Sequence, residues 1–372
     1  MLIGVPREIK PQEYRVGLTP EAVAELVQRS HSVLVETGAG DGIGAGDDAY
    51  RSVGADLVAD PRAVFAADMV VKVKEPQPAE RRMMREGQVL FTYLHLAPDP
   101  DLTRDLVRTG AVCIAYETVT DARGGLPLLR PMSQVAGRMA VQVGASALER
   151  EHGGRGVLLG GVPGVAPARV VIIGGGVVGF NAAQMAIGLQ ADVTILERDL
   201  LVLERLSTQF GATARVVYAN RATLDENLAS ASLVIGAVLI PGAAAPKLVT
   251  RAHLARMVHG AVLVDVSIDQ GGCCETSRPT THGSPTFVEE GIVHYCVPNM
   301  PGAVPHTSTY ALSNATLVHV LALADKGWRQ ALRNDAHLRH GLNVCAGRVT
   351  QPAVAQALGY DLTPAETLLE GD

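Results

Sequence analysis

The sequence lacks the features that would identify a membrane, secreted or nucleic-acid-binding protein. Its longest apolar region, residues 156–180, is interrupted by prolines, glycines and Arg169, so it cannot form a membrane-spanning segment. The first eight residues have neither the basic flank nor the apolar core and cleavage site of a secretory signal. The net charge is −6 and basic residues form no run, so we expect neither nucleic acid nor an anionic membrane surface as a partner.

Cysteine is scarce and shows no disulfide or metal-binding pattern. The five cysteines are Cys113, Cys273, Cys274, Cys296 and Cys345. They are an odd number and form no Cys-x-x-Cys pair, so we expect reduced thiols in a cytoplasmic protein and no bound metal.

What the chain does have is length and an ordinary globular composition. It contains 372 residues, of which 47% are hydrophobic and 19% charged. That is too long for one ordinary core, so two domains are expected.

The most specific pattern begins at residue 170. Residues 170–173 form a β-branched apolar run, typical of a strand buried on both faces. The run leads directly into Gly174-x-Gly176-x-x-Gly179, the spacing of a dinucleotide-binding turn. In such a turn the first glycine permits the tight bend and the second lets a pyrophosphate approach the backbone. The third lets the helix pack closely on its strand.

The residues that follow complete a βαβ unit. A helix over 177–189 would point its N-terminus at the bound anion. A strand over 193–196 ends in Glu197, where an acid would hold the ribose hydroxyls. Strand, glycines, helix, strand and acid in this order favour a dinucleotide site over an ordinary glycine turn.

The segment before this unit also alternates strands and helices, which indicates a second parallel sheet. The expected strands are 2–5, 33–36, 69–73, 89–93 and 112–116. Thr19-Pro20-Glu21 begins a helix that continues through Arg29, because it combines a capping hydroxyl with a first-turn proline and an acid. A second helix fits residues 99–109.

Further βα repeats follow the fingerprint. Ser133 is expected to cap a long helix that runs to about Glu151 and joins two domains. Later strands are expected at 214–217, 233–235 and 262–264. From about Thr307 the pattern is helical (310–324, then 328–333), and no further strand is expected there.

These patterns predict an α/β fold with two Rossmann-like, doubly wound domains and a catalytic cleft between them. The predicted substrate domain comprises residues 1–130 and 307–372. The predicted NAD-binding domain comprises residues 131–306.

Two polar residues follow neighbouring strands of the first sheet, where ligands gather in α/β folds. Lys74 would offer a point charge to a carboxylate or carbonyl oxygen, although a solvated loop lysine would fit the same position. His95 suits proton transfer near neutral pH, although a structural histidine would also fit. The presence of both at one sheet edge favours a functional site.

Two further residues are less certain from their positions alone. Arg15 could bind a carboxylate through its guanidinium fork, but Arg7 and Lys10 lie in the same segment. Asp269 follows a strand of the second sheet and could face the nicotinamide, or it could simply form a turn. Cys273 and Cys274, which lie nearby, are expected to be buried thiols.

Taken together, several segments resemble the alanine dehydrogenase family, which also includes the cofactor-binding subunit of proton-translocating transhydrogenase. They are Gly4-Val5-Pro6-Arg7-Glu8, Glu13-Tyr14-Arg15-Val16, Lys72-Val73-Lys74-Glu75-Pro76, Tyr93-Leu94-His95-Leu96-Ala97, Pro131-Met132-Ser133-Gln134-Val135-Ala136-Gly137, the glycine fingerprint, residues 265–272, residues 275–282 and Pro298-Asn299-Met300-Pro301-Gly302. The resemblance covers essentially the whole chain in order.

This resemblance implies roles for the residues above. Arg15 and Lys74 would bind the substrate carboxylate and carbonyl oxygen, and His95 and Asp269 would be the catalytic pair. The positions implied for NAD contacts, with those of the fingerprint, are Ser133, Gly174, Gly176, Val177, Val178, Gly179, Glu197, Val238, Leu239, Val266, Ser267, Ile268, Asp269, Val297, Pro298, Asn299 and Met300.

A few positions depart from the family pattern. Glu197 stands where aspartate is usual and is followed by Arg198, which bears on the choice between NAD and NADP. Gln12 and Gly17 replace asparagine and alanine near Arg15, and His306 replaces an arginine. None of these changes removes a proposed catalytic group.

The implied activity is NAD-dependent interconversion of L-alanine with pyruvate and ammonium, in a protein that the family resemblance suggests is a homohexamer. One alternative is a transhydrogenase-type subunit that binds NAD(H) and passes hydride to another nucleotide. A second is a non-catalytic NAD-sensing module.

Overall fold

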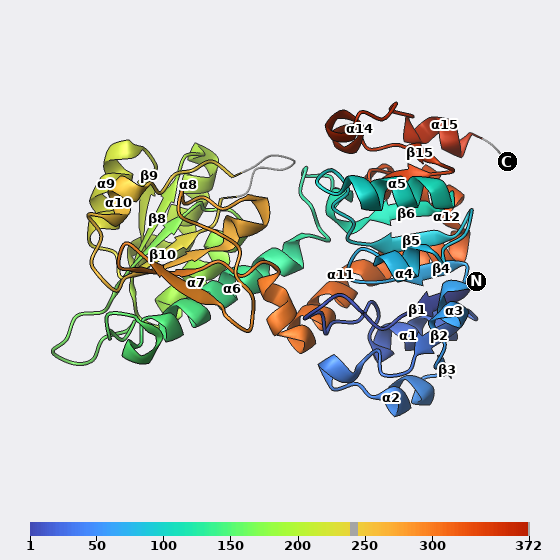
Figure 1. The fold of residues 1–372 in the computed structure, drawn as a ribbon, viewed down its shortest axis with the longest axis horizontal. Helices are drawn as coiled ribbons and strands as arrows, with labels where there is room; N and C mark the ends of the chain where they lie inside the picture. The colour runs from blue at the N-terminus through green and yellow to red at the C-terminus, as the bar shows by residue number, and fades with distance from the viewer. Residues whose placement is uncertain (239–244, 371–372) are drawn as a thin grey trace. The chain divides into compact units, whose positions relative to one another are not determined.

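The computed structural model describes residues 1–238 and 245–370, and the chain divides into two compact units. Unit 1 contains Met1–Met132 and Gly302–Asp372, and unit 2 contains Ser133–Pro301. Unit 2 is therefore inserted in the sequence of unit 1, and the predicted α/β class with two Rossmann-like sheets is confirmed (Figure 1).

Unit 1 is built on one eight-stranded sheet in the order β15-β14-β6-β5-β4-β1-β2-β3. The strands are β1 (Leu2–Val5), β2 (Ser32–Glu36), β3 (Asp56–Val58), β4 (Met69–Val71), β5 (Val89–Thr92), β6 (Val112–Ala115), β14 (Leu342–Cys345) and β15 (Arg348–Val349). Strands β1 to β6 are parallel to one another. The strand order reverses between β1 and β4, so the loops that follow these two strands lie at the topological switch point, where α/β folds bind ligands.

The helices of unit 1 follow from local capping signals. They are α1 (Pro20–Gln28), α2 (Asp47–Ser52), α3 (Pro61–Phe65), α4 (Pro78–Arg81), α5 (Pro100–Thr109), α11 (Pro305–Lys326), α12 (Trp328–Asn334), α13 (Ala336–Arg339), α14 (Pro352–Leu358) and α15 (Ala365–Leu369). Thr19 caps α1 by accepting from the Ala22 N–H, and Asp99 caps α5 in the same way through Leu102. Helix α1 therefore begins where its capping signal predicted, and α5 begins where a helix was expected.

The prediction that the tail contains no strand is wrong. Strand β14 pairs antiparallel with β6 in the sheet of unit 1, and β15 pairs with β14. The strand was missed because it is only four residues long and includes a buried polar residue, Asn343, which interrupts the apolar pattern. The Asn343 amide donates to the Thr118 hydroxyl and the Gly341 carbonyl, which permits its burial.

Unit 2 contains a seven-stranded sheet in the order β12-β13-β11-β10-β7-β8-β9. Its strands are β7 (Arg169–Ile173), β8 (Asp192–Glu197), β9 (Arg215–Tyr218), β10 (Leu233–Gly236), β11 (Val262–Asp265), β12 (Thr286–Glu289) and β13 (Ile292–Tyr295). The edge strand β12 is antiparallel to β13, and the other pairs are parallel. The order reverses between β7 and β10, so the glycine turn after β7 also lies at a switch point.

The longer helices that accompany this sheet are α6 (Arg130–Ala147), α7 (Val177–Gly188), α8 (Leu200–Phe210) and α9 (Arg221–Ala229). Helix α7 agrees with the prediction. For α6 the predicted bounds are wrong: the helix starts at Arg130, with Pro131 in its first turn, and ends at Ala147. Ser133 consequently lies inside the first turn instead of capping it, because a proline is already compatible with that turn.

Apolar side chains predominate in the interiors of both units. All five cysteines are free thiols, as predicted, and all five are buried. Within the described ranges, no helix is both long and apolar enough to span a bilayer.

Candidate active site

Three of the predicted groups follow neighbouring strands of unit 1. Arg15 lies in the segment after β1, Lys74 lies just after β4, and His95 lies just after β5. Because β1 pairs with β4 and β4 with β5, all in parallel, their carboxyl ends share one edge of the sheet. The structure therefore places a guanidinium, an ammonium and an imidazole after three neighbouring strands, at the same end of the unit 1 sheet as its switch point.

Arg15 is buried, with 2% of its surface exposed, and it is held by Glu13. Its Nε and Nη2 atoms each donate to one Glu13 carboxylate oxygen at 2.6 Å, and its Nη1 lies 3.1 Å from the Met132 sulfur. Burial opposes the charge of Arg15, but the hydrogen bonds and charge of Glu13 prevail and raise its pKa. Arg15 is therefore a fixed cation, and the Nε–Nη2 edge of its guanidinium already binds the Glu13 carboxylate. Glu13 was not among the predicted site residues.

The segment that carries Lys74 is anchored by a buried charge cluster that sequence reasoning also missed. Lys72 is fully buried, and its Nζ donates to Glu8 at 3.0 Å and to Glu80 at 2.8 Å. The other Glu8 oxygen accepts from the Val73 N–H at 2.7 Å and from the Lys74 N–H at 3.2 Å. Burial raises the pKa of Glu8, partly offset by Lys72. This Lys72 cluster (Glu8, Lys72, Glu80) fixes the backbone at Lys74, whose side chain is half-buried.

His95 has an exposed side chain and an unusual backbone. Its φ of +50° is in the left-handed region, which is rare for residues other than glycine. Its ring stacks on Tyr93 at 5.9 Å between centroids, with planes 4° apart. The Tyr93 hydroxyl donates to the Leu128 carbonyl at 2.6 Å, and burial raises the pKa of Tyr93. A neutral, anchored tyrosine therefore supports one face of the imidazole.

Glu117 is a further residue at this edge that the sequence did not indicate. It lies in η2 (Tyr116–Thr118), directly after β6, and only 12% of its side chain is exposed. Its carboxylate accepts from the N–H groups of Leu94 and His95. An acid in a short turn gives no pattern of its own, and only the pairing of β5 with β6 brings it to His95.

In unit 2 the glycine turn has the geometry that its spacing predicts. Gly174 has φ +104°, and a Cβ there would lie 2.7 Å from the Ala237 carbonyl oxygen. A Cβ at Gly179 would lie 1.8 Å from the Gly174 carbonyl oxygen, so only glycine permits this approach of α7 to the turn. Around Gly176, which caps α7, nothing lies within 4 Å of a Cβ position. This space at a helix N-terminus fits a dinucleotide pyrophosphate, and Val177 and Val178 begin the helix.

Glu197 ends β8 as predicted, and its carboxylate is tied to the glycine turn. One oxygen accepts from the Gly175 N–H at 2.7 Å, and the other accepts from the N–H groups of Arg198 at 2.6 Å and Asp199 at 3.0 Å. The acid thus shapes the turn, and it ends the strand on which the sequence predicts the ribose-binding acid. Arg198 is exposed.

Two acids at the turn after β11, Asp265 and Asp269, differ in burial and in their contacts. Asp265 is buried and accepts from the N–H groups of Ser267, Cys273 and Cys274. Asp269, in η5 (Val266–Gln270), is exposed, and its Oδ1 lies 3.3 Å from the Asn299 nitrogen that donates to it. Asp265 therefore holds the backbone of this turn, whereas Asp269 contacts the segment after β13.

The remaining predicted cofactor positions follow strands of the same sheet. Ser267 donates through its hydroxyl to the Val238 carbonyl at 2.7 Å, which links the segments after β11 and β10. Val266 and Ile268 lie in η5, and residues 297–300 follow β13, with Val297 and Met300 buried and Pro298 and Asn299 half-buried. Ser133 is half-buried in α6. Leu239 lies outside the described residues.

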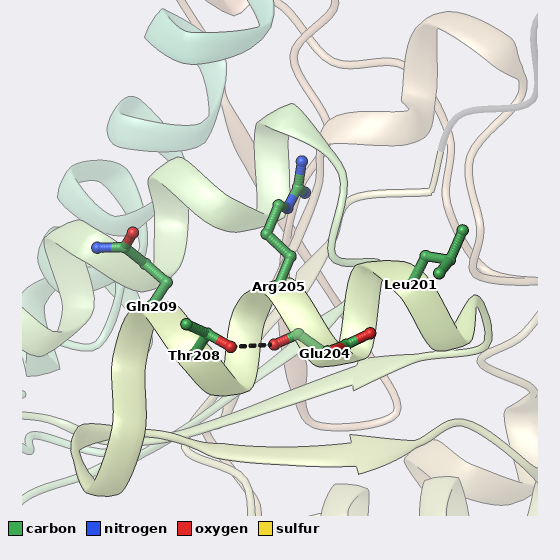
Figure 2. Close-up of a pocket in the computed structure, with 5 residues that line it drawn as sticks. All are labelled: Leu201, Glu204, Arg205, Thr208 and Gln209. Atoms are coloured by element: carbon green, nitrogen blue, oxygen red, sulfur yellow. Dashed lines mark hydrogen bonds between the residues drawn. The ribbon is translucent and has the colours of Figure 1, made fainter.

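A hollow of 520 Å³ lies along α8, lined by Leu201, Glu204, Arg205, Thr208 and Gln209 (Figure 2). None of the predicted site residues that the structure describes lines it. Arg205 reaches from α8 to the Gly175 carbonyl at 3.2 Å, so this helix supports the glycine turn.

Two doubly wound units define a nucleotide-binding α/β protein of the dehydrogenase class: one holds a dinucleotide turn, and the other a guanidinium, an ammonium and an imidazole at its strand ends. The chain belongs to the alanine dehydrogenase/PNT family. Residues 4–136 match the N-terminal domain of this family, and residues 140–352 match its C-terminal domain.

Relatives of known name support this membership. The chain is 56% identical over 370 residues to alanine dehydrogenase of Halomonas elongata, and the match covers 99% of this chain and 100% of that protein. It is 53% identical to alanine dehydrogenase of Bacillus subtilis, with 100% and 98% covered. A solved L-alanine dehydrogenase superposes with a TM-score of 0.94 at 53% identity, over 96% of this chain and 99% of that one. A transhydrogenase from Sinorhizobium meliloti shares the fold, with a TM-score of 0.83 at 22% identity over 94% and 100%.

Proposed function

We propose that this protein catalyses the NAD-dependent oxidative deamination of L-alanine to pyruvate and ammonium, and its reverse. The observation that carries the proposal is that Arg15, Lys74 and His95 follow three neighbouring parallel strands at the switch-point end of the unit 1 sheet, in a chain whose unit 2 holds the dinucleotide turn. Bound NAD supplies the hydride acceptor.

The residues of the chain provide binding and proton transfer. Arg15 and Lys74 orient the substrate and offset the negative charge of its carboxylate and of the developing alkoxide. After hydride leaves the alanine α-carbon, water adds to the imine, and the carbinolamine collapses to ketone and ammonia. His95 moves the protons of these steps, and Asp269 orients or shares them.

In this proposal unit 1 is the substrate domain and unit 2 the cofactor domain. The glycine turn, Glu197, Val238 and the segments 266–269 and 297–300 hold the nucleotide, together with Ser133. We further propose a cytoplasmic homohexamer that needs no nucleic acid, membrane or metal.

The main alternative is a transhydrogenase-type cofactor subunit. Such a subunit needs no pocket for a small acid, whereas this chain places a cation and an imidazole together at one sheet edge. A non-catalytic NAD-sensing module would not need them either.

The deciding experiment is NADH formation, followed by absorbance, with NAD and a panel of L-amino acids. Strong turnover with L-alanine supports the proposal. Turnover with none of them, together with hydride transfer between nucleotides, would favour the transhydrogenase-type alternative.

The role of His95 is tested separately by His95→Ala. Turnover should fall by about 10²–10⁴-fold, the usual contribution of a general acid–base group. NADH affinity, measured by fluorescence titration, should survive because the nucleotide residues belong to unit 2. Turnover within a few-fold of the unmodified protein would remove His95 from the mechanism.

A further inference from the structure

The backbone of the segment that carries His95 needs an external support. His95 is in the left-handed region at φ +50°, which residues with a Cβ seldom adopt. It follows β5 in a loop, and its side chain is exposed. Such a conformation persists when surrounding contacts over-determine it.

A single carboxylate provides these contacts. One Glu117 oxygen accepts from the His95 N–H at 2.6 Å and from the Leu94 N–H at 3.2 Å, and its other oxygen also accepts from Leu94 at 3.2 Å. Hydrogen bonds to a charged acceptor are among the stronger ones in proteins. Glu117 itself follows β6, which is paired with β5 through four residues, so it is anchored to the sheet.

The same carboxylate also faces the imidazole. The oxygen that binds the His95 N–H lies 3.9 Å from His95 Nδ1. A small rotation of the ring would turn this approach into a hydrogen bond from Nδ1–H. A carboxylate in this position fixes the tautomer, so that Nε2 is the nitrogen that exchanges protons.

We propose that Glu117 is a positioning residue for His95: it holds the backbone of the loop and orients the imidazole with Nδ1–H toward its carboxylate. His95 Nε2 then takes the hydroxyl proton of the carbinolamine whose amino group is protonated; the C–N bond breaks as the ketone forms, ammonia leaves, and the Nδ1 proton stays in place. This inference rests on the proposed function, because it presumes that His95 transfers protons.

Glu117→Gln and Glu117→Ala test the proposal. Glutamine keeps one oxygen for the backbone N–H groups but loses the charge, whereas alanine loses both. We expect kcat for alanine oxidation to fall by about 10–100-fold in Glu117→Ala, the scale typical of carboxylates that orient a functional histidine at metal sites, and by less in Glu117→Gln. NADH affinity should not change.

Two measurements distinguish a change in the orientation of the His95 imidazole from a general loss of protein stability. The solvent deuterium isotope effect on kcat should rise in both variants, because proton transfer becomes slower. Nitrogen NMR of His95 should show less of the Nδ1–H tautomer. The matched control is Glu36→Gln, since Glu36 is also buried at a strand end and accepts a backbone N–H, from Arg7 at 3.0 Å. It should change neither readout.

The outcomes are distinguishable. If the unmodified protein forms no NADH from NAD and L-alanine, the proposed function fails. If it does but His95→Ala keeps its turnover, His95 is not in the mechanism and the inference is overturned while the proposed function stands. If His95→Ala loses turnover but both Glu117 variants keep their kcat, the inference is overturned and the proposed function stands. A fall in kcat with an unchanged isotope effect and tautomer would give Glu117 a purely structural role and also overturn the inference.

Discussion

The guanidinium of Arg15 is held along its Nε–Nη2 edge by Glu13, so its orientation is set before any substrate arrives. Lysine keeps the charge but has no fork, so Arg15→Lys should weaken both the Glu13 pair and carboxylate binding. We expect higher Michaelis constants for pyruvate and alanine, with little change for NAD. Steady-state kinetics with each substrate varied in turn will measure this.

The same variant should also lose stability. Removing one partner of a buried ion pair costs about 3–5 kcal/mol, and lysine should cost less because it keeps the charge. If the Michaelis constants for both pyruvate and alanine stay the same, another cation binds the carboxylate, and Arg7 is the next candidate.

The Glu197 carboxylate both binds the glycine turn and carries the charge that bears on nucleotide choice. A 2′-phosphate beside this carboxylate would be repelled, so we expect NAD to be preferred over NADP by at least about tenfold, or ~1.4 kcal/mol. Glu197→Ser should reduce the preference by admitting the phosphate and letting Arg198 pair with it. The measurement is kcat/KM for NAD and for NADP in both proteins.

Serine is too short to reach the Gly175 N–H that Glu197 binds, so Glu197→Gln is the control. Glutamine keeps an acceptor oxygen for the turn and removes only the charge. A reduced preference in both variants assigns the discrimination to charge. An unmodified protein that uses both nucleotides equally would mean that Glu197 does not select against the phosphate.

The sequence allowed Lys74, His95 and Asp269 to be proposed, because each follows a recognisable strand with a chemistry-bearing group. Glu13, Glu8 and Glu117 could not be found in this way. The contacts of Glu8 and Glu117 depend on segments 22 or more residues away, and no local pattern indicates which acid reaches which N–H.

At the scale of elements, the segment after β4 contains two lysines that the structure treats differently. Lys72 is fully buried between Glu8 and Glu80, whereas Lys74 is half-buried. Lys72→Met should cost about 3–5 kcal/mol of stability, because it leaves two buried carboxylates without their cation. Lys74→Met should cost far less stability and should instead abolish most turnover.

Urea unfolding and alanine oxidation, measured on both variants, separate the two roles. If Lys72→Met unfolds like the unmodified protein, the cluster is not a structural anchor. If Lys74→Met retains full turnover, the substrate role belongs elsewhere.

Elements with strong local signals were predictable, and short ones were not. Helix α1 and the βαβ unit from β7 to β8 combine capping or glycine signals with clear periodicity. Strand β14 has four residues with a polar one inside, and its place beside β6 is decided by tertiary pairing. Such long-range pairing leaves no trace in a local pattern.

At the scale of the whole molecule, stability should fall on mild acidification. His294 is fully buried, and its imidazole contacts the Thr276 hydroxyl and the Ile292 carbonyl. Burial lowers its pKa below the usual value of about 6.5. Between the folded and unfolded pKa values the unfolded chain binds more protons, so stability rises with pH in that window and is lost as pH falls through about 6.5.

His294→Gln should therefore reduce the change in thermal midpoint between about pH 7.5 and about pH 5.5, whatever its cost at the higher pH. The quantity compared is the change in thermal midpoint between the two pH values within each protein. The stability that the substitution itself costs therefore cancels. An equal acid sensitivity in the variant would assign the effect to other groups, such as His319, whose pKa burial also lowers.

The position of β14 beside β6 also matters on the ribosome. The nascent chain presents β6 early, but its antiparallel neighbour is translated only after all of unit 2. At ordinary elongation rates this delay lasts roughly ten to fifty seconds. Throughout it, one side of β6 has unpaired backbone groups, which are a template for pairing with another chain. The interval before β14 emerges is therefore when a newly made chain is most exposed to misassociation and has most to gain from a chaperone.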